Sequence, residues 1–153
     1  MLRSRGYITT LENARHFLDT QRLKGRTIEE VRKNQAQFQH EVLQLQIDQE
    51  KEIAPHVQVF LDRAIPDALA YYRYLKLPVD KLLRDALETV SYKKIFIMDP
   101  LPLVNDYART ENVEAQQKLH QLITEVYEAL PFPVVHVPVL SAEERVGFIL
   151  ANL

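Results

Sequence analysis

The chain has 153 residues, which is enough for one domain with a hydrophobic core. Its composition is 46% hydrophobic and 26% charged, and its net charge of −2 gives no reason to expect nucleic acid or an anionic membrane as a partner. It has no cysteine, which excludes thiolate chemistry, and no apolar run resembles a signal peptide or approaches the roughly 18 residues of a membrane span, so we expect a cytoplasmic protein.

The N-terminal third predicts a short strand followed by two helices. A strand over 6–10 precedes a helix over 11–19, which the sequence KGRT ends. Thr27 and Glu30 then form a T-x-x-E capping box for the next helix. Because the following apolar residues recur at helical spacings, we expect one long helix that continues to about residue 52.

The rest of the chain alternates apolar strands with helices. The predicted strands are 57–62, 93–99 and 133–140. Four helices are predicted between and after these strands. The first begins near Pro66, the second spans 78–90, the third spans 115–130, and the last begins at a capping box of Ser141 and Glu144. Short apolar strands separated by helices favour a parallel sheet covered on both faces. We therefore expect a single α/β domain over 1–153, with three α/β/α layers and a mostly parallel sheet.

Charged residues stand at the ends of two of these strands, where ligands bind in parallel sheets. Asp62 and Arg63 follow the first apolar strand, and Asp99 follows the second. An Asp in this place can hold Mg²⁺, and an Arg can bind phosphate with two parallel hydrogen bonds. The alternative is structural: Asp62 would cap the helix that begins near Pro66, and Arg63 would pair with a surface carboxylate.

Two further segments carry candidate site residues. Arg109 lies in a polar stretch before a helix, where it can close over phosphates, or simply remain a solvated loop arginine. Glu12 and Arg15 are three residues apart, so they share a helix face and can form an ion pair. Alternatively they face a substrate, with Glu12 accepting a hydroxyl proton. The histidines show no metal-ligand spacing.

Taken in order, several motifs resemble the P-loop AAA-type ATPase and kinase-like family. This group is similar to the ribosylnicotinamide kinase domain and, more distantly, to deoxynucleoside kinases. The resemblance covers nearly the whole chain. The motifs are RGY, LENAR, VFLDRAIPDALAYYRYLKLP, KKIFIMDPLP, YARTENVEAQQKLHQLITEVYEALPFPVVHVP and SAEERVGFIL.

The resemblance implies phosphoryl transfer from Mg-ATP, or ATP hydrolysis, with a nucleotide and a small molecule as ligands. It implies that Asp62 holds the metal beside Arg63, and that Arg109 is the lid arginine. It also implies that Glu12 and Arg15 lie on the substrate side, and that Asp67 is the second acid of the strand-end motif.

The chain departs from this family in one respect. No G-x-x-x-x-G-K-[ST] occurs in the 153 residues, and the sequence opens where the second strand of the family is expected. We therefore expect a P-loop fold without its first strand and P-loop, whose two neighbouring strands are left exposed or pair with each other. Either a longer protein supplies the missing part, or a shortened descendant serves as a binding or assembly module. Such a module would self-associate through its exposed strand edges or the long helix.

Overall fold

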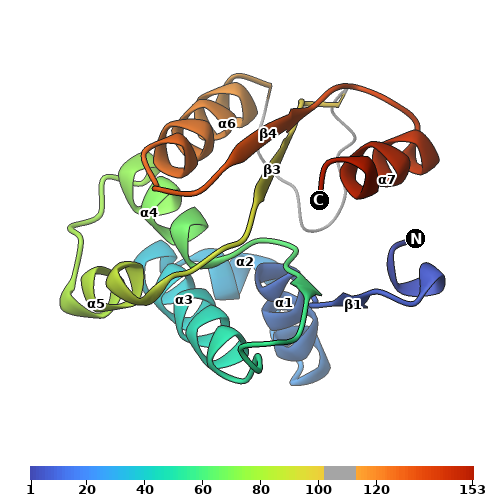
Figure 1. The fold of residues 1–153 in the computed structure, drawn as a ribbon. Coiled ribbons are helices and arrows are strands. Elements are labelled where there is room, and N and C mark those ends of the chain that lie inside the picture. The colour runs from blue at the N-terminus through green and yellow to red at the C-terminus, as the bar shows by residue number, and fades with distance from the viewer. Residues whose placement is uncertain (102–112) are drawn as a thin grey trace.

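The structure is a computed structural model, and it describes residues 1–101 and 113–153. Helices and strands alternate along most of the chain, as Figure 1 shows. The helical elements are η1 (Arg3–Arg5), α1 (Asn13–Leu23), α2 (Ile28–Arg32), α3 (Gln35–Lys51), α4 (Ile65–Tyr74), α5 (Lys81–Thr89), α6 (Val113–Glu128) and α7 (Ala142–Ala151). The strands are β1 (Ile8–Thr9), β2 (Val59–Phe60), β3 (Ile95–Met98) and β4 (Val134–Val137).

The strands pair in parallel, as predicted, but the four strands do not form one sheet. β1 pairs with β2, with Ile8 opposite Val59, and β3 pairs with β4, with Ile95 opposite Val134. β2 and β3 are not hydrogen-bonded to each other. Of the two outcomes that we expected for the middle of the sheet, exposed edges are therefore found and direct pairing is not.

The predicted long helix is wrong in one place, because α2 and α3 are separate helices. The capping box of Thr27 and Glu30 is confirmed and begins α2. Asn34 then interrupts the helix: its side chain accepts a hydrogen bond from the backbone N–H of Gln37 and caps α3. Asparagine competes for backbone hydrogen bonds in this way, so it favours the start of a helix over its interior. The second predicted capping box, Ser141 with Glu144, is confirmed at α7.

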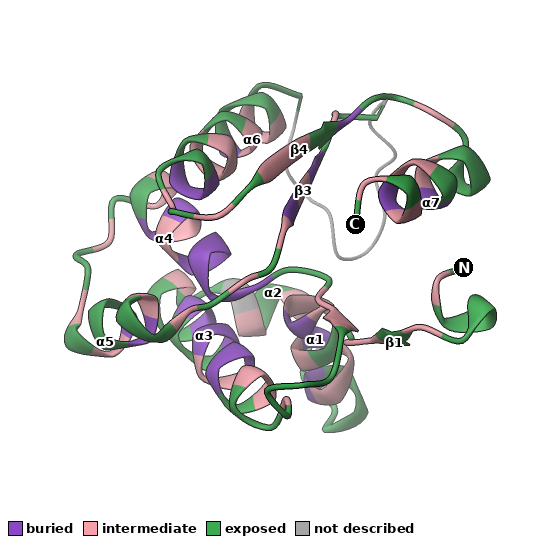
Figure 2. Cartoon of the chain, viewed as in Figure 1, coloured by how far each residue is buried: buried purple, intermediate pink, exposed green. Residues whose placement is uncertain are grey.

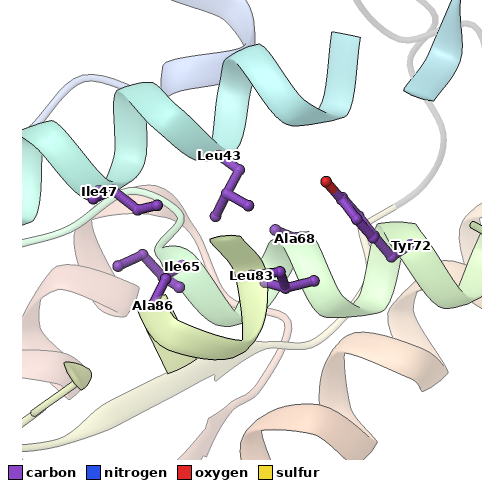
Figure 3. Close-up of a cluster of buried hydrophobic side chains, with 7 residues drawn as sticks. All are labelled: Leu43, Ile47, Ile65, Ala68, Tyr72, Leu83 and Ala86. Atoms are coloured by element: carbon purple, nitrogen blue, oxygen red, sulfur yellow. The ribbon is translucent and has the colours of Figure 1, made fainter. Parts of the chain in front are cut away.

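The hydrophobic core is divided into three clusters of buried side chains. The largest joins α3, α4 and α5 and is drawn in Figure 3; its buried members are Leu43, Ile47, Ile65, Ala68, Tyr72, Leu83 and Ala86. A second joins α1, α2 and α3 around Leu18 and Phe38. The third joins β3 to α6 through Ile95, Ile97 and Tyr127. Buried positions in Figure 2 accordingly gather in the middle of the molecule, where α3 and α4 meet.

Candidate functional site

β2 ends in a tight turn that presents Asp62 and Arg63. The backbone N–H of Asp62 donates to Thr10 Oγ1 at 3.1 Å, which ties the end of β2 to the end of β1. Arg63 has φ of 69°, a left-handed conformation that costs a non-glycine residue of order 1 kcal/mol or more. The backbone therefore leaves the extended conformation of β2 at Arg63.

Asp67 holds Arg63 in place from the first turn of α4. Arg63 Nη1 donates to Asp67 Oδ1 at 2.8 Å. The guanidinium side chain remains 39% exposed while the carboxylate side chain is only 6% exposed. The negative charge of Asp67 raises the pKa of Arg63 above its ordinary value, so the guanidinium stays charged. This contact corrects the structural alternative for Arg63, because its partner is a buried carboxylate and not a surface one.

The other oxygen of Asp67 accepts two more hydrogen bonds. The backbone N–H of Ala64 donates to Asp67 Oδ2 at 3.1 Å, and the Tyr127 hydroxyl donates to the same oxygen at 2.5 Å. Ala64 is the N-cap residue of α4, so Asp67 and not Asp62 caps this helix. Burial, followed by the charge of Asp67, raises the pKa of Tyr127 well above its usual range. These hydrogen bonds to Asp67 replace the water molecules that its carboxylate loses on burial.

A second carboxylate supports the same helix end. Glu50, near the end of α3, accepts from the backbone N–H of Ile65 at 3.0 Å and from the Tyr92 hydroxyl at 3.0 and 3.2 Å. Burial raises the pKa of Glu50 above its usual value, and burial also raises the pKa of Tyr92. The two acids thus fix the N-terminus of α4, from which Arg63 projects.

Two hollows meet at these residues. A pocket of about 350 Å³ lies between α1, α3, α4 and α6. A wide groove of about 2300 Å³ lies between the two strand pairs. The lining of both includes Glu12, Arg63, Asp67 and Tyr71, which therefore form a shared wall. Asp62 and Asp99 border only the groove.

Helix α3 contributes three glutamines to the pocket, beside the apolar Phe38 and Val42. Gln35, Gln39 and Gln46 all line it, and Gln39 and Gln46 are buried. Gln46 Oε1 is buried without a hydrogen-bond partner among the described residues. An amide oxygen in this position can accept a hydrogen bond from a polar group of a ligand.

Glu12 and Arg15 pair with each other, as in the first of their two readings. Glu12 is the N-cap of α1 and accepts from the backbone N–H of Arg15 at 3.3 Å. Arg15 Nε lies 3.9 Å from Glu12 Oε2, at the limit of an ion pair. Glu12 lines both hollows, whereas Arg15 lines only the groove. Arg109 lies outside the described residues.

Sequence reasoning had selected four of these seven residues as candidates. Asp62, Arg63, Asp67 and Glu12 were predicted, and the last three are brought together at one wall. Glu50, Tyr92 and Tyr127 were missed. No motif identifies them, because the Tyr127–Asp67 contact spans 60 residues and the Tyr92–Glu50 contact spans 42.

The described residues contain neither a metal cage nor a membrane helix. Over 1–101 and 113–153, no three His, Cys, Asp or Glu side chains gather in a group that could hold a metal ion. In these same ranges each helix is too short or too polar to cross a bilayer.

Parallel strands alternating with helices define a mixed α/β protein. A family model described as an AAA domain matches residues 1–145, nearly the whole chain. The chain belongs to this family of P-loop NTPases, whose members generally use ATP and Mg²⁺. No curated protein and no solved structure gave a significant match.

Proposed function

We propose that this chain carries the acceptor side and the metal side of a phosphoryl-transfer site. The reaction would move a phosphoryl group from ATP to a small metabolite such as a nucleoside, or to water. The observation that carries the proposal is the shared wall, where Glu12, Arg63 and Asp67 lie between a small pocket and a much larger groove. Phosphoryl transfer needs such an arrangement, because acceptor and donor must meet from two sides.

The acceptor would occupy the smaller pocket. A volume of about 350 Å³ is at the lower end of the range for small-molecule sites. Glu12 would accept the proton of the attacking hydroxyl, and Gln39 and Gln46 would bind polar groups of the same molecule. Arg63 would sit where negative charge develops during transfer, held by Asp67.

The nucleotide and its metal would occupy the groove. Asp62 is exposed and borders the groove, and it is the residue that would hold Mg²⁺. Mg²⁺ is commonly bound by only one or two carboxylates together with phosphate oxygens and water, so a single Asp fits the ion. When bound, the ion would neutralise phosphate charge. Arg109 would act as the lid arginine, which is an expectation from the sequence alone.

A glycine-rich phosphate loop is absent from these 153 residues, so we expect residues 1–153 alone to be inactive. Isothermal titration calorimetry with Mg-ATP tests this expectation. Very weak binding or none is the expected result, and micromolar binding by this polypeptide would refute it. The coding DNA upstream of Met1 provides a second test. An in-frame G-x-x-x-x-G-K-[ST] supports the longer kinase, and an immediate stop codon contradicts it.

The acceptor pocket can be tested separately, because its residues are all present. We expect a panel of nucleosides to include one that binds residues 1–153, and Glu12→Gln to weaken that binding by about tenfold, as for one charge-assisted hydrogen bond. Glu88→Gln is the matched control, since Glu88 is exposed on α5 and lines neither hollow. Equal affinity in both variants would remove Glu12 from the site.

A second candidate function is a non-catalytic assembly module. It is favoured by the exposed apolar residues that line the groove, which a soluble monomer rarely leaves open. A dimer that forms with increasing concentration, together with no nucleotide or nucleoside affinity, would support this function over the kinase.

A further inference from the structure

Helix α7 carries an arginine without a counter-charge. Arg145 is half-buried, and its Nε is buried without a hydrogen-bond partner. In the part of the chain that the structure describes, its guanidinium takes part in no ion pair. A guanidinium has several N–H donors and stays charged throughout the pH range in which proteins are folded. Arg145 therefore presents an uncompensated positive charge with donors that an anion can use.

The acids next to Arg145 on the same helix are engaged elsewhere. Glu143 pairs with Arg5, with 3.2 Å between Glu143 Oε1 and Arg5 Nη2. Glu144 accepts from the backbone N–H of Ser141 at 2.9 Å, within the capping box of α7. Residues one or two positions apart on a helix do not face each other. Neither acid lines the groove, whereas Arg145 does, so the acids of its own helix do not neutralise Arg145 there.

Arg145 lies close to the carboxyl end of the second strand pair. It is in the first turn of α7, which follows β4 after a short loop and packs against that strand (Figure 1). Ile149, one turn further along, also lines the groove, so this face of α7 forms part of its wall. Asp99 follows β3 at the same end and lines the groove, but it forms no ion pair with Arg145. Because ligands of α/β sheets bind at the carboxyl ends of the strands, Arg145 is well placed to contact one.

We propose that Arg145 binds a phosphate-type oxyanion in the groove. The planar guanidinium can donate two parallel hydrogen bonds to one phosphate group, which makes arginine a strong ligand for such anions. The oxyanion can belong to a free polyphosphate or to a nucleotide, because both offer the same oxygens to Arg145. The two sources are separated by experiment below.

An oxyanion site at Arg145 goes beyond the proposed function, which rests on Glu12, Arg63 and Asp67. Arg145 does not line the pocket, and it comes from a different helix and a different strand pair. Oxyanion binding can be measured without any nucleoside. Its failure would therefore leave the acceptor pocket untouched, and failure of the pocket would leave the site at Arg145 untouched.

NMR signals of the arginine Nε–H groups report anion binding at single residues. We expect sodium pyrophosphate, added to the protein at constant ionic strength, to shift the Arg145 signal in a saturable way. Half of the shift should occur at a concentration at least about tenfold below that needed at Arg84, since a half-buried charge is less screened by salt. Arg84 is the control because it is exposed on α5 and lines neither hollow. Equal responses at the two arginines would overturn the proposal.

The same titration distinguishes the possible anions. Acetate offers two oxygens but no phosphate group, and an effect on Arg145 equal to that of pyrophosphate would overturn the assignment to a phosphate-type oxyanion. Tighter binding of ADP than of pyrophosphate at Arg145 would support the proposal with a nucleotide as the source. Equal or weaker binding of ADP would support it with a free polyphosphate as the source.

Urea denaturation gives an independent readout, because a half-buried charge without a counter-charge disfavours the folded state. Arg145→Met keeps an unbranched apolar stem and removes the charge, so we expect it to raise the urea midpoint. Arg84→Met is the exposed control and should leave the midpoint unchanged. Pyrophosphate should raise the midpoint of the parent protein but not that of Arg145→Met, because it binds only the folded state through Arg145. A lower midpoint in Arg145→Met, or an equal pyrophosphate effect in both proteins, would overturn the proposal.

Discussion

The N-terminus of α4 and the groove between the strand pairs differ in how their residues are partnered. At the start of α4, Asp67 and Glu50 together accept hydrogen bonds from backbone amides, a guanidinium and two phenols. Along the groove, β2 and β3 belong to separate two-stranded sheets, and exposed apolar side chains such as Met98 and Val139 line the hollow. The polar groups of the first region are thus partnered within the chain, whereas the second region presents apolar surface to solvent.

The two regions are expected to differ in local stability and in their access to partners. Buried and fully hydrogen-bonded regions resist local opening, whereas edges with exposed backbone groups open easily and accept partners. The completed region holds Arg63 at the wall shared by the pocket and the groove. Arg63 is therefore held by a rigid support at the border of the groove, as a ligand-binding side chain needs to be.

The largest expected effect comes from removing core volume next to α4. Leu83 is 0% exposed in the cluster that joins α3, α4 and α5. We expect Leu83→Ala to lower the free energy of unfolding by about 4 kcal/mol, since the cavity cannot close fully. Urea denaturation measures the change. Met98→Ala, on the groove side, is the control, and a similar loss there would erase the difference between the two regions.

Breaking the buried ion pair is expected to have the next largest effect. Asp67→Asn leaves the charge of Arg63 without its counter-charge and replaces one of the two accepting oxygens by an NH2 group, which cannot accept. We expect a loss of about 2 kcal/mol, a value reduced because Arg63 is partly exposed. Asp85→Asn removes the partner of Lys81 on the surface and should leave the urea midpoint unchanged. Equal effects of the two substitutions would mean that Asp67 is not structurally special.

Removal of one hydroxyl is a milder test of the same network. Tyr127→Phe deletes the 2.5 Å hydrogen bond to Asp67 but keeps the ring in its cluster with Ile95 and Ile97. Because Asp67 Oδ2 still accepts from Ala64 N, we expect a loss of only about 1 kcal/mol. Thermal unfolding of the variant and of Tyr7→Phe, whose ring contacts Phe60, provides the comparison. A variant as stable as the parent would argue against the contact.

The smallest expected effect concerns pH. Burial raises the pKa of Glu50 above its ordinary value, so the folded state binds a proton more tightly than the unfolded state. Stability contributed by this proton is present below the unfolded pKa and is lost as pH rises through the folded pKa. Glu50→Gln keeps acceptors for Ile65 N and Tyr92, and we expect it to flatten this decline above pH 4.5. Urea denaturation across pH 4 to 8 checks the slope, and an unchanged slope would contradict the assignment.

Sequence reasoning succeeded where the determining interactions are local. The capping boxes at Thr27 and Ser141 were predicted, because each joins residues three positions apart. The same reasoning missed the break at Asn34, where one side chain outweighed a helical apolar pattern. It also left open whether Asp62 caps α4, because two acids lie close to that helix start and only packing selects Asp67.

The sequence by itself determined the order of helices and strands, their parallel pairing, and the family to which the chain belongs. These properties follow from periodicity, caps and ordered motifs, which are all written along the chain. Only the tertiary structure decided that Glu50, Tyr92 and Tyr127 support the site, and that β2 and β3 stand apart. The physical reason is that partners for a buried carboxylate, or for a strand edge, come from residues distant in sequence. Folding brings such residues together, and the pattern along the chain does not show which of them will meet.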